Sequence, residues 1–110
     1  MGMFDFEDGK GLVPAHQHKN GGGWVAETAT VEKSAFVGPD AWVFGHARVS
    51  GDAVVSGHAR VSGEAWVFGN ALVSGEAWVF GNALVSGNAL VSGNALVPSG
   101  CQICGYTILV

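Results

Sequence analysis

Charge is scarce in this chain. Charged residues make up 13% of the 110 residues, and the formal net charge is −4. The five Lys and Arg residues form no run, so the sequence lacks the basic patch that binds nucleic acid. Long apolar segments are also missing, because glycine interrupts the chain repeatedly and a membrane-spanning helix needs about 18 consecutive apolar residues. We therefore expect neither a nucleic-acid partner nor a membrane span.

Two further signals are absent. The chain begins with an acidic Met-Gly-Met-Phe-Asp-Phe-Glu-Asp segment, which lacks the basic and apolar regions of a signal peptide. Cysteine is limited to Cys101 and Cys104, with no second Cys-x-x-Cys pair that would complete a zinc site. The simplest interpretation is two free thiols in a reducing compartment. No cofactor is predicted.

A six-residue repeat dominates what is present. The pattern Gly-x-Ala-x-Val-x runs from Gly21 to Val110 without insertion, as fifteen consecutive units. Two apolar residues separated by one variable residue indicate strand alternation, with both apolar side chains facing one way. A glycine followed by Asn or Asp, as in Gly69-Asn70, favours a sharp corner after each short strand. Such short strands become stable only when successive coils stack, so the sequence predicts an all-β solenoid.

These units resemble the hexapeptide-repeat proteins, in which a small residue stands two places before an aliphatic one. Residues 37–42, Val-Gly-Pro-Asp-Ala-Trp, fit that unit well. The resemblance covers residues 21–110. It implies a single-stranded left-handed parallel β-helix of triangular section, with three units in each coil and therefore about five coils.

The two ends of the chain differ in character. We expect residues 1–20, which precede the repeats, to form an N-terminal cap that covers the open edge of the first coil. The apolar residues of this cap are Phe4, Phe6, Leu12 and Val13. At the other end the repeats continue through residues 107–110, Thr-Ile-Leu-Val, and we expect an apolar, unpaired strand edge there.

Three columns of outward residues follow from the family's coil, in which residues 18 apart lie above one another. The first column is apolar along its whole length and contains Phe36, Val54, Leu72, Leu90 and Ile108. Monomeric soluble proteins seldom expose such a continuous stripe. We therefore expect a homo-oligomer packed through this column, with a trimer as the leading form and end-to-end stacking of the last coil as the alternative. Plain exposure of the stripe is the third possibility.

The other two columns combine tryptophan with arginine. One reads Trp24, Trp42, Arg60, Trp78, Leu96, and the other reads Thr30, Arg48, Trp66, Leu84, Gln102. A guanidinium over an indole ring is a favourable cation–π arrangement. We expect Arg60 to lie between Trp42 and Trp78, and Arg48 to contact Trp66. The tryptophans are either a ligand-stacking platform or structural filler between stacked strands.

Histidines provide the candidate metal ligands. His16 and His18 form a His-x-His pair that resembles the tip of iron-binding phage spike proteins, where the rings converge in a trimer. Two corner columns also place a histidine next to carboxylates, on both sides of His58 and on one side of His46. They contain Asp40, His58, Glu76, Asn94 and Thr28, His46, Glu64, Asn82. Such a corner either holds a metal or a base, or carries surface ion pairs of little energetic value.

The detailed sequence of the repeats indicates a structural role. Runs such as Trp-Val-Phe-Gly-Asn-Ala-Leu-Val-Ser-Gly resemble small hexapeptide-repeat proteins of phage and prophage genomes, most of which have no assigned activity. This implies a non-catalytic assembly or interaction module, in the cytoplasm of a bacterial host or on a virion. The tandem segments 63–74 and 75–86 agree, because a 12-residue duplication moves each copy to another face of the coil.

Two other functions stay open. The best-known hexapeptide-repeat proteins are acyltransferases, which place a catalytic histidine between subunits and carry a protruding loop and a C-terminal helical region. This sequence shows neither the loop nor the helical region. A metal-binding protein of the spike-tip kind is the second alternative, with His16 and His18 as ligands.

Overall fold

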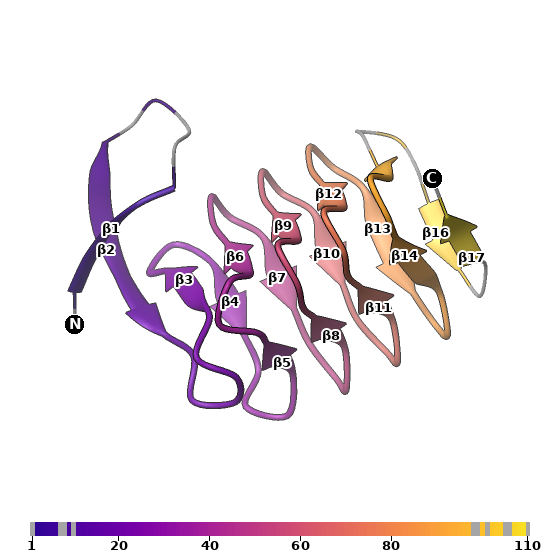
Figure 1. Cartoon of the computed structure of the whole chain (residues 1–110), viewed down its shortest axis with the longest axis horizontal. Coiled ribbons are helices and arrows are strands. Elements are labelled where there is room, and N and C mark those ends of the chain that lie inside the picture. The colour runs from indigo at the N-terminus through magenta and orange to yellow at the C-terminus, as the bar shows by residue number, and fades with distance from the viewer. Residues whose placement is uncertain are drawn as a thin grey trace.

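Short strands account for all the regular structure in the computed structural model of this chain. The structure describes residues 2–6, 9, 11–97, 100, 102–104 and 107–109, the last two segments by their backbone alone. These residues form seventeen strands and no helix (Figure 1). The described part of the chain therefore offers no helix that could cross a membrane.

A hairpin precedes the solenoid. Strand β1 (Gly2–Asp5) pairs antiparallel with β2 (Leu12–Gln17), and β2 pairs antiparallel with β3 (Trp24–Ala26). The hairpin thus extends one sheet of the solenoid at its N-terminal end, whereas β16 and β17 lie at the opposite end (Figure 1).

Three parallel sheets make up the solenoid, and each strand is two or three residues long. After the hairpin and β3, the first sheet contains β6 (Trp42–Val43), β9 (Arg60–Val61), β12 (Trp78–Val79) and β15 (Leu96–Val97). The second sheet contains β4 (Thr30–Val31), β7 (Arg48–Val49), β10 (Trp66–Val67), β13 (Leu84–Ser86) and β16 (Gln102–Cys104). The third sheet contains β5 (Phe36–Val37), β8 (Val54–Val55), β11 (Leu72–Val73), β14 (Leu90–Ser92) and β17 (Thr107–Leu109).

The pairing register gives the length of one coil. Val43 lies opposite Val61 in the first sheet, and Val49 lies opposite Val67 in the second, so partners are 18 residues apart. Three six-residue units therefore complete one coil, as the repeat predicted, and the all-β solenoid is confirmed. The left hand of the coil and the number of coils stay predictions.

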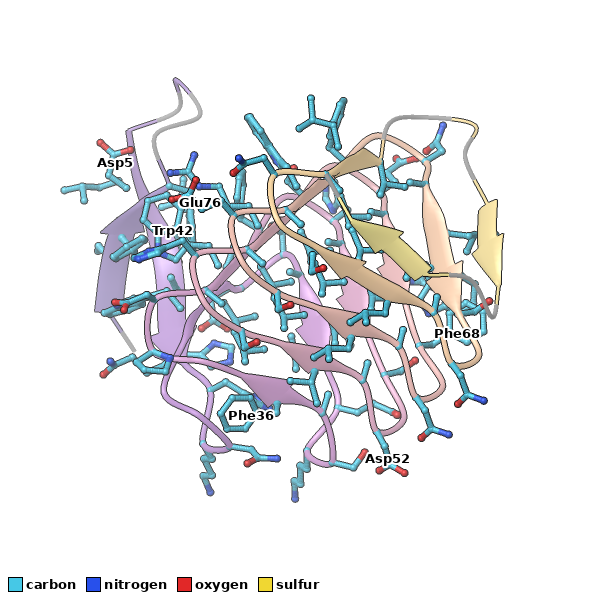
Figure 2. All side chains as sticks on the ribbon, turned by 45° about the vertical axis from the view of Figure 1, so that its right-hand side comes forward. Asp5, Phe36, Trp42, Asp52, Phe68 and Glu76 are labelled. Atoms are coloured by element: carbon cyan, nitrogen blue, oxygen red, sulfur yellow. The ribbon has the colours of Figure 1, made fainter. Side chains whose placement is uncertain are left out.

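The interior is filled by the Ala and Val slots of the repeat. From Ala35 to Val97, every alanine and valine in these two slots is at most 1% exposed, and their side chains line the inside of the coil (Figure 2). Burying one valine contributes about 1.5–3 kcal/mol relative to leaving it in water. Val31 is only partly buried, because β4 ends its sheet and the hairpin covers the first sheet instead.

Glycine is needed at the corners for two reasons. Gly63 has a φ of +66°, which residues with a side chain rarely adopt. A Cβ atom at Gly63 would also lie 2.7 Å from the backbone nitrogen of Gly81 in the next coil. The corner therefore requires both the conformational freedom of glycine and its lack of a side chain, since glycine stacks directly on glycine.

The hairpin packs on the first coil through only part of the predicted set. Phe6 is 1% exposed, and Phe4 stacks on Trp24 with ring centroids 4.7 Å apart. Val13 packs against the core, but Leu12 is 65% exposed, so its predicted covering role is wrong. Neighbouring residues of a strand point to opposite faces, so of Leu12 and Val13 on β2 only Val13 faces the solenoid.

The predicted register fails at the last strand. β13 and β16 keep the spacing of 18, with Val85 opposite Ile103, but β14 and β17 pair Val91 with Ile108, 17 residues on. Ile108 therefore occupies the register position of the inward valine, not that of the apolar outward column. A slip of one residue exchanges the two faces of a strand. The sequence does not fix this register, because both Ile108 and Leu109 suit an apolar slot.

Candidate functional site

The outward columns lie in the register that the repeat predicted, apart from Ile108. Leu72 lies between Val54 and Leu90 on the third sheet, and Phe36 pairs with Val54. All four side chains are half-buried, because each is flanked by its neighbours in the stack. We call Phe36, Val54, Leu72 and Leu90 the Phe36 column. Figure 2 shows Phe36, on β5, and Phe68, which follows β10, on different sides of the solenoid.

Cation–π contacts join the first sheet across three coils. The guanidinium carbon of Arg60 lies 4.5 Å from the ring centroid of Trp42 and 5.7 Å from that of Trp78. On the second sheet, Arg48 lies 5.5 Å from the ring centroid of Trp66. Arg60 therefore takes the position between two indole rings that its column predicted. These contacts agree with a structural role for the tryptophans, although Trp66 and Trp78 stay 40% and 39% exposed.

Two shallow hollows repeat the same four residue types on adjacent sheets. One of about 430 Å³ is lined by His58, Arg60, Glu76 and Trp78. The other, of about 350 Å³, is lined by His46, Arg48, Glu64 and Trp66. Each residue of the first set stands 12 positions after its counterpart in the second, although only the Glu and Trp of each set belong to the tandem segments 63–74 and 75–86. Across the described residues, no three His, Cys, Asp or Glu side chains are grouped to hold a metal ion.

His16 and His18 have separate partners. Nδ1 of His16 lies 2.6 Å from Oε2 of Glu27, and Nε2 of His18 donates to the backbone oxygen of Ala35 at 2.8 Å. His18 is 7% exposed, whereas His16 is half-exposed, and both line a hollow that also contains Lys19 and Lys33. These contacts fix the loop that leads into the first coil, and two lysines beside the histidines oppose a metal cation.

The structure does not test the prediction for the two cysteines. Cys101 lies outside the described residues, and Cys104 is placed only by its backbone, opposite Ser86.

Another hollow was not predicted from the sequence. It has a volume of about 530 Å³ and lies at the corner after the strands of the first sheet. Phe44, Ser62 and Phe80 line it together with Trp78, Leu96, His46 and Glu64. The signal that could have revealed it is the column formed by the residue after each valine, where Ser62 stands between two phenylalanines.

Among the solenoid residues whose side chains the structure describes, the most exposed large apolar ones lie on the first and second sheets. Trp66 is 40% exposed, Trp78 is 39% exposed and Leu96 is 62% exposed. Two of these three, Trp78 and Leu96, line the hollow at Ser62. Exposed apolar surface is thus concentrated beside a concave feature, which is typical of binding sites.

Similarity to known proteins extends to the repeat alone. Residues 41–57, 77–93 and 83–100 match the YdcK beta solenoid repeat family model. Together these segments cover less than half of the chain, so the match supports a repeat β-solenoid and goes no further. No curated protein and no solved structure gives a significant match to the chain.

Proposed function

We propose that this chain is a non-catalytic assembly module, a rigid β-solenoid of phage or mobile-element type that binds copies of itself through the Phe36 column. Such a module would work in the cytoplasm of a bacterial host or on a virion. A trimer is the preferred form, and end-to-end stacking of coils is the alternative. The observation that carries this proposal is the uncharged, in-register Phe36 column on the third sheet.

The surface around this column suits close contact between two copies. Ser56, Ser74 and Ser92 follow the inward valines of β8, β11 and β14, so small side chains flank the apolar column. Neither the column nor these serines carries a charge, so two copies would meet without burying an unpaired ion. No charged residue occurs from residue 77 to 110, which removes repulsion along that part of the molecule.

Magnitudes favour a weak to moderate association. Four apolar side chains in one stripe would bury on the order of several hundred Å² per subunit, at about 25 cal/mol for each Å². Part of that energy offsets the translational and rotational freedom lost on association.

The enzymatic and metal-binding alternatives have less support. The histidines at the corners, His46 and His58, share their shallow hollows with arginine and tryptophan side chains that stack on one another. His16 and His18 are engaged by Glu27 and by the Ala35 carbonyl. No feature of the described residues favours acyl transfer or metal binding over assembly.

Mass in solution tests the proposal. Light scattering at tens of micromolar should find the wild type larger than one chain, and Leu72→Glu with Leu90→Glu should give a smaller, folded species. The matched control is Leu84→Glu with Leu96→Glu, which adds the same charge on the second and first sheets and should keep the wild-type mass. A monomeric wild type would refute self-association. If both double variants keep the wild-type mass, the copies meet elsewhere, and end-to-end stacking replaces the Phe36 column.

A further inference from the structure

The N-terminal end of the solenoid leaves one of its three sheets uncovered. On the first sheet, β2 pairs with β3. On the third sheet, the chain before β3 covers β5, because the Gly23 amide donates to Val37 O and the Val37 amide donates to Asn20 O. The second sheet ends at β4, which pairs only with β7 among the strands that the structure describes. The edge of β4 is therefore open at this end.

The backbone of β4 offers two hydrogen-bonding groups at this edge. The Thr30 amide donates to Ala47 O and the Glu32 amide donates to Val49 O, so the residues on both sides of Val31 bond toward β7. Backbone groups of successive residues in a strand point to opposite sides, so the amide and carbonyl of Val31 point away from β7. An unpaired strand edge of this kind is a template for pairing with another extended chain.

A hollow of about 510 Å³ lies beside this edge. Two segments line it, namely β4 with the corner after it and the end of β2 with the loop that follows, through Val31, Lys33, His16, Gln17, His18 and Lys19. Val31 is only partly buried, whereas Val25 and Val37, the inward valines of the same coil, are 0% exposed. The valine ladder of the second sheet therefore ends at the hollow without an apolar side chain over it, as far as the described residues go.

The volume of this hollow suits a short strand. With about 4.8 Å between strands, about 3.3 Å for each residue and about 10 Å across the pleated strand, one residue takes up about 160 Å³. A hollow of about 510 Å³ therefore has room for about three residues beside β4.

Positive charge gathers around this hollow in a chain that is acidic overall. Two of the five Lys and Arg residues, Lys19 and Lys33, line it, and no Asp or Glu is among the described residues that do. Two carboxylates close to it in sequence are engaged elsewhere, because Glu27 pairs with His16 and Glu32 accepts a hydrogen bond from the backbone of the next coil. The hollow thus favours an acidic ligand.

We propose that the open edge of β4 binds an extended acidic peptide, which adds one strand to the second sheet. The peptide backbone bonds to the amide and carbonyl of Val31, the mode of recognition that sheet edges commonly use. An apolar side chain of the peptide covers Val31 and continues the inward ladder. Side chains two positions apart share a face of a strand, so an acidic residue two places from the apolar one reaches Lys19 and Lys33.

A second copy of the chain suits this edge less well. Its last strand on the second sheet, β16, has the sequence Gln-Ile-Cys and brings no carboxylate to Lys19 and Lys33. The edges of β3 and β5 at this end are already covered, so a second solenoid could not continue all three sheets.

This site is separate from the proposed assembly surface. The edge of β4 ends the second sheet, and the Phe36 column lies on the third sheet. Loss of peptide binding therefore leaves the assembly proposal intact, and a monomeric wild type leaves the peptide proposal intact.

The probe is the peptide acetyl-Glu-Thr-Val-Thr-Glu-amide, whose sequence is the same in both directions and so tests the edge whichever way the strand runs. NMR of the full chain follows the Val31 amide, which should shift saturably and exchange more slowly with water as it gains a hydrogen bond. We expect a Kd on the order of 1 mM for so short a peptide. Replacing both Glu by Gln, or methylating the three central amides, should each weaken binding at least about fivefold.

Val31→Pro removes the amide at the open edge without removing a bond to β7, so proline is tolerated there. The protein should stay folded, and peptide affinity, followed at the Lys33 amide, should fall about tenfold or more. Thr30→Pro is the matched control, because it removes the amide that donates to Ala47 O and should melt at a lower temperature than Val31→Pro.

The lysines are tested one at a time, and these variants also serve if Val31→Pro does not fold. Lys19→Gln and Lys33→Gln change exposed side chains and should each weaken binding about threefold. Arg48→Gln removes the same charge from the outward face of the second sheet and should bind the peptide as the wild type does.

Four results contradict the inference. No saturable shift at about 10 mM peptide, far above the expected Kd, would mean that the edge takes no strand. Wild-type affinity in a folded Val31→Pro protein would place the peptide elsewhere. Equal binding of the Glu and Gln peptides would remove charge as the basis of recognition. A lower mass of Val31→Pro than of the wild type in light scattering would show that a second copy occupies the edge.

Discussion

The residues that fill the interior of this solenoid are nearly uniform, whereas those on its outer surface vary from coil to coil. Inside, alanine and valine recur in every unit from Ala35 to Val97 and are almost completely buried. Outside, a single column of the first sheet contains tryptophan, arginine and leucine at equivalent positions. The inward ladder determines the fold, and the outward columns vary because nothing in the coil constrains their size. Function in such a protein is therefore sought on its outer surface.

The cause of this contrast is stacking at fixed spacing. Each inward residue contacts its equivalents one coil above and one coil below, so a change in volume or charge acts on two neighbours at once. An outward residue can turn its side chain toward water. Corner glycines lie between these two cases, since their backbone is constrained although they face solvent.

The largest effect is expected inside. Val67→Asp puts a carboxylate at a position that is 0% exposed, between Val49 and Val85 of the second sheet. An unpaired carboxylate buried in an apolar ladder should cost about 4 kcal/mol or more and unfold the chain. Circular dichroism with thermal melting measures the loss.

The adjacent residue provides the control for this comparison. Trp66→Asp changes an outward position that is 40% exposed and sets the new carboxylate beside Arg48. It should stay folded and lose about 1 kcal/mol or less. A folded, soluble Val67→Asp protein would contradict the inward assignment and with it the difference between the two surfaces.

A smaller effect is expected at the corners. Gly63→Ala meets both a φ of +66° and a contact of 2.7 Å to the nitrogen of Gly81, whereas Gly22→Ala meets a φ of +83° with no atom within 4 Å. The first change should cost about 2–3 kcal/mol and the second about 1 kcal/mol. Urea unfolding of the two variants measures this difference. Equal costs would show that conformation alone, and not the stacking of glycine on glycine, selects glycine at the corner.

The repeat was sufficient to predict the coil but not its ends. Spacing by six predicted the 18-residue register, because inward valines such as Val61 must lie above their equivalents. The hairpin was predicted only as a cap, since residues 1–20 lack a repeat that would show antiparallel pairing. The register of Ile108 was predicted wrongly because both Ile108 and Leu109 suit the inward apolar slot, so the sequence pattern allows two pairings.

The outer surface also has features that the repeat predicts and features that it does not. Columns of equivalent residues predicted the contacts of Arg60 with two indole rings, because both follow from register alone. The surroundings of Ala26 and Ser62 do not follow from register, because Phe6 stacks beside Ala26 on Phe44 and the Trp78 indole donates a hydrogen bond to Ser62 Oγ. Register shows where a small residue stands, but only the three-dimensional structure shows which side chain covers it.

The smallest effect is expected on the outer surface, at the arginines. Arg60 contacts two indole rings and is half-buried, whereas Arg48 contacts one and is exposed. Methionine keeps most of the aliphatic stem and removes the charge, so Arg60→Met should lower the free energy of unfolding by about 1 kcal/mol and Arg48→Met by about 0.5 kcal/mol. Urea unfolding followed by tryptophan fluorescence measures both, and the fluorescence of the folded state reports the loss of the guanidinium beside Trp42. If Arg48→Met and Arg60→Met lower the free energy of unfolding equally, the second indole contact of Arg60 adds no stability. Contacts between outward residues of adjacent coils would then contribute no more than isolated surface charges do.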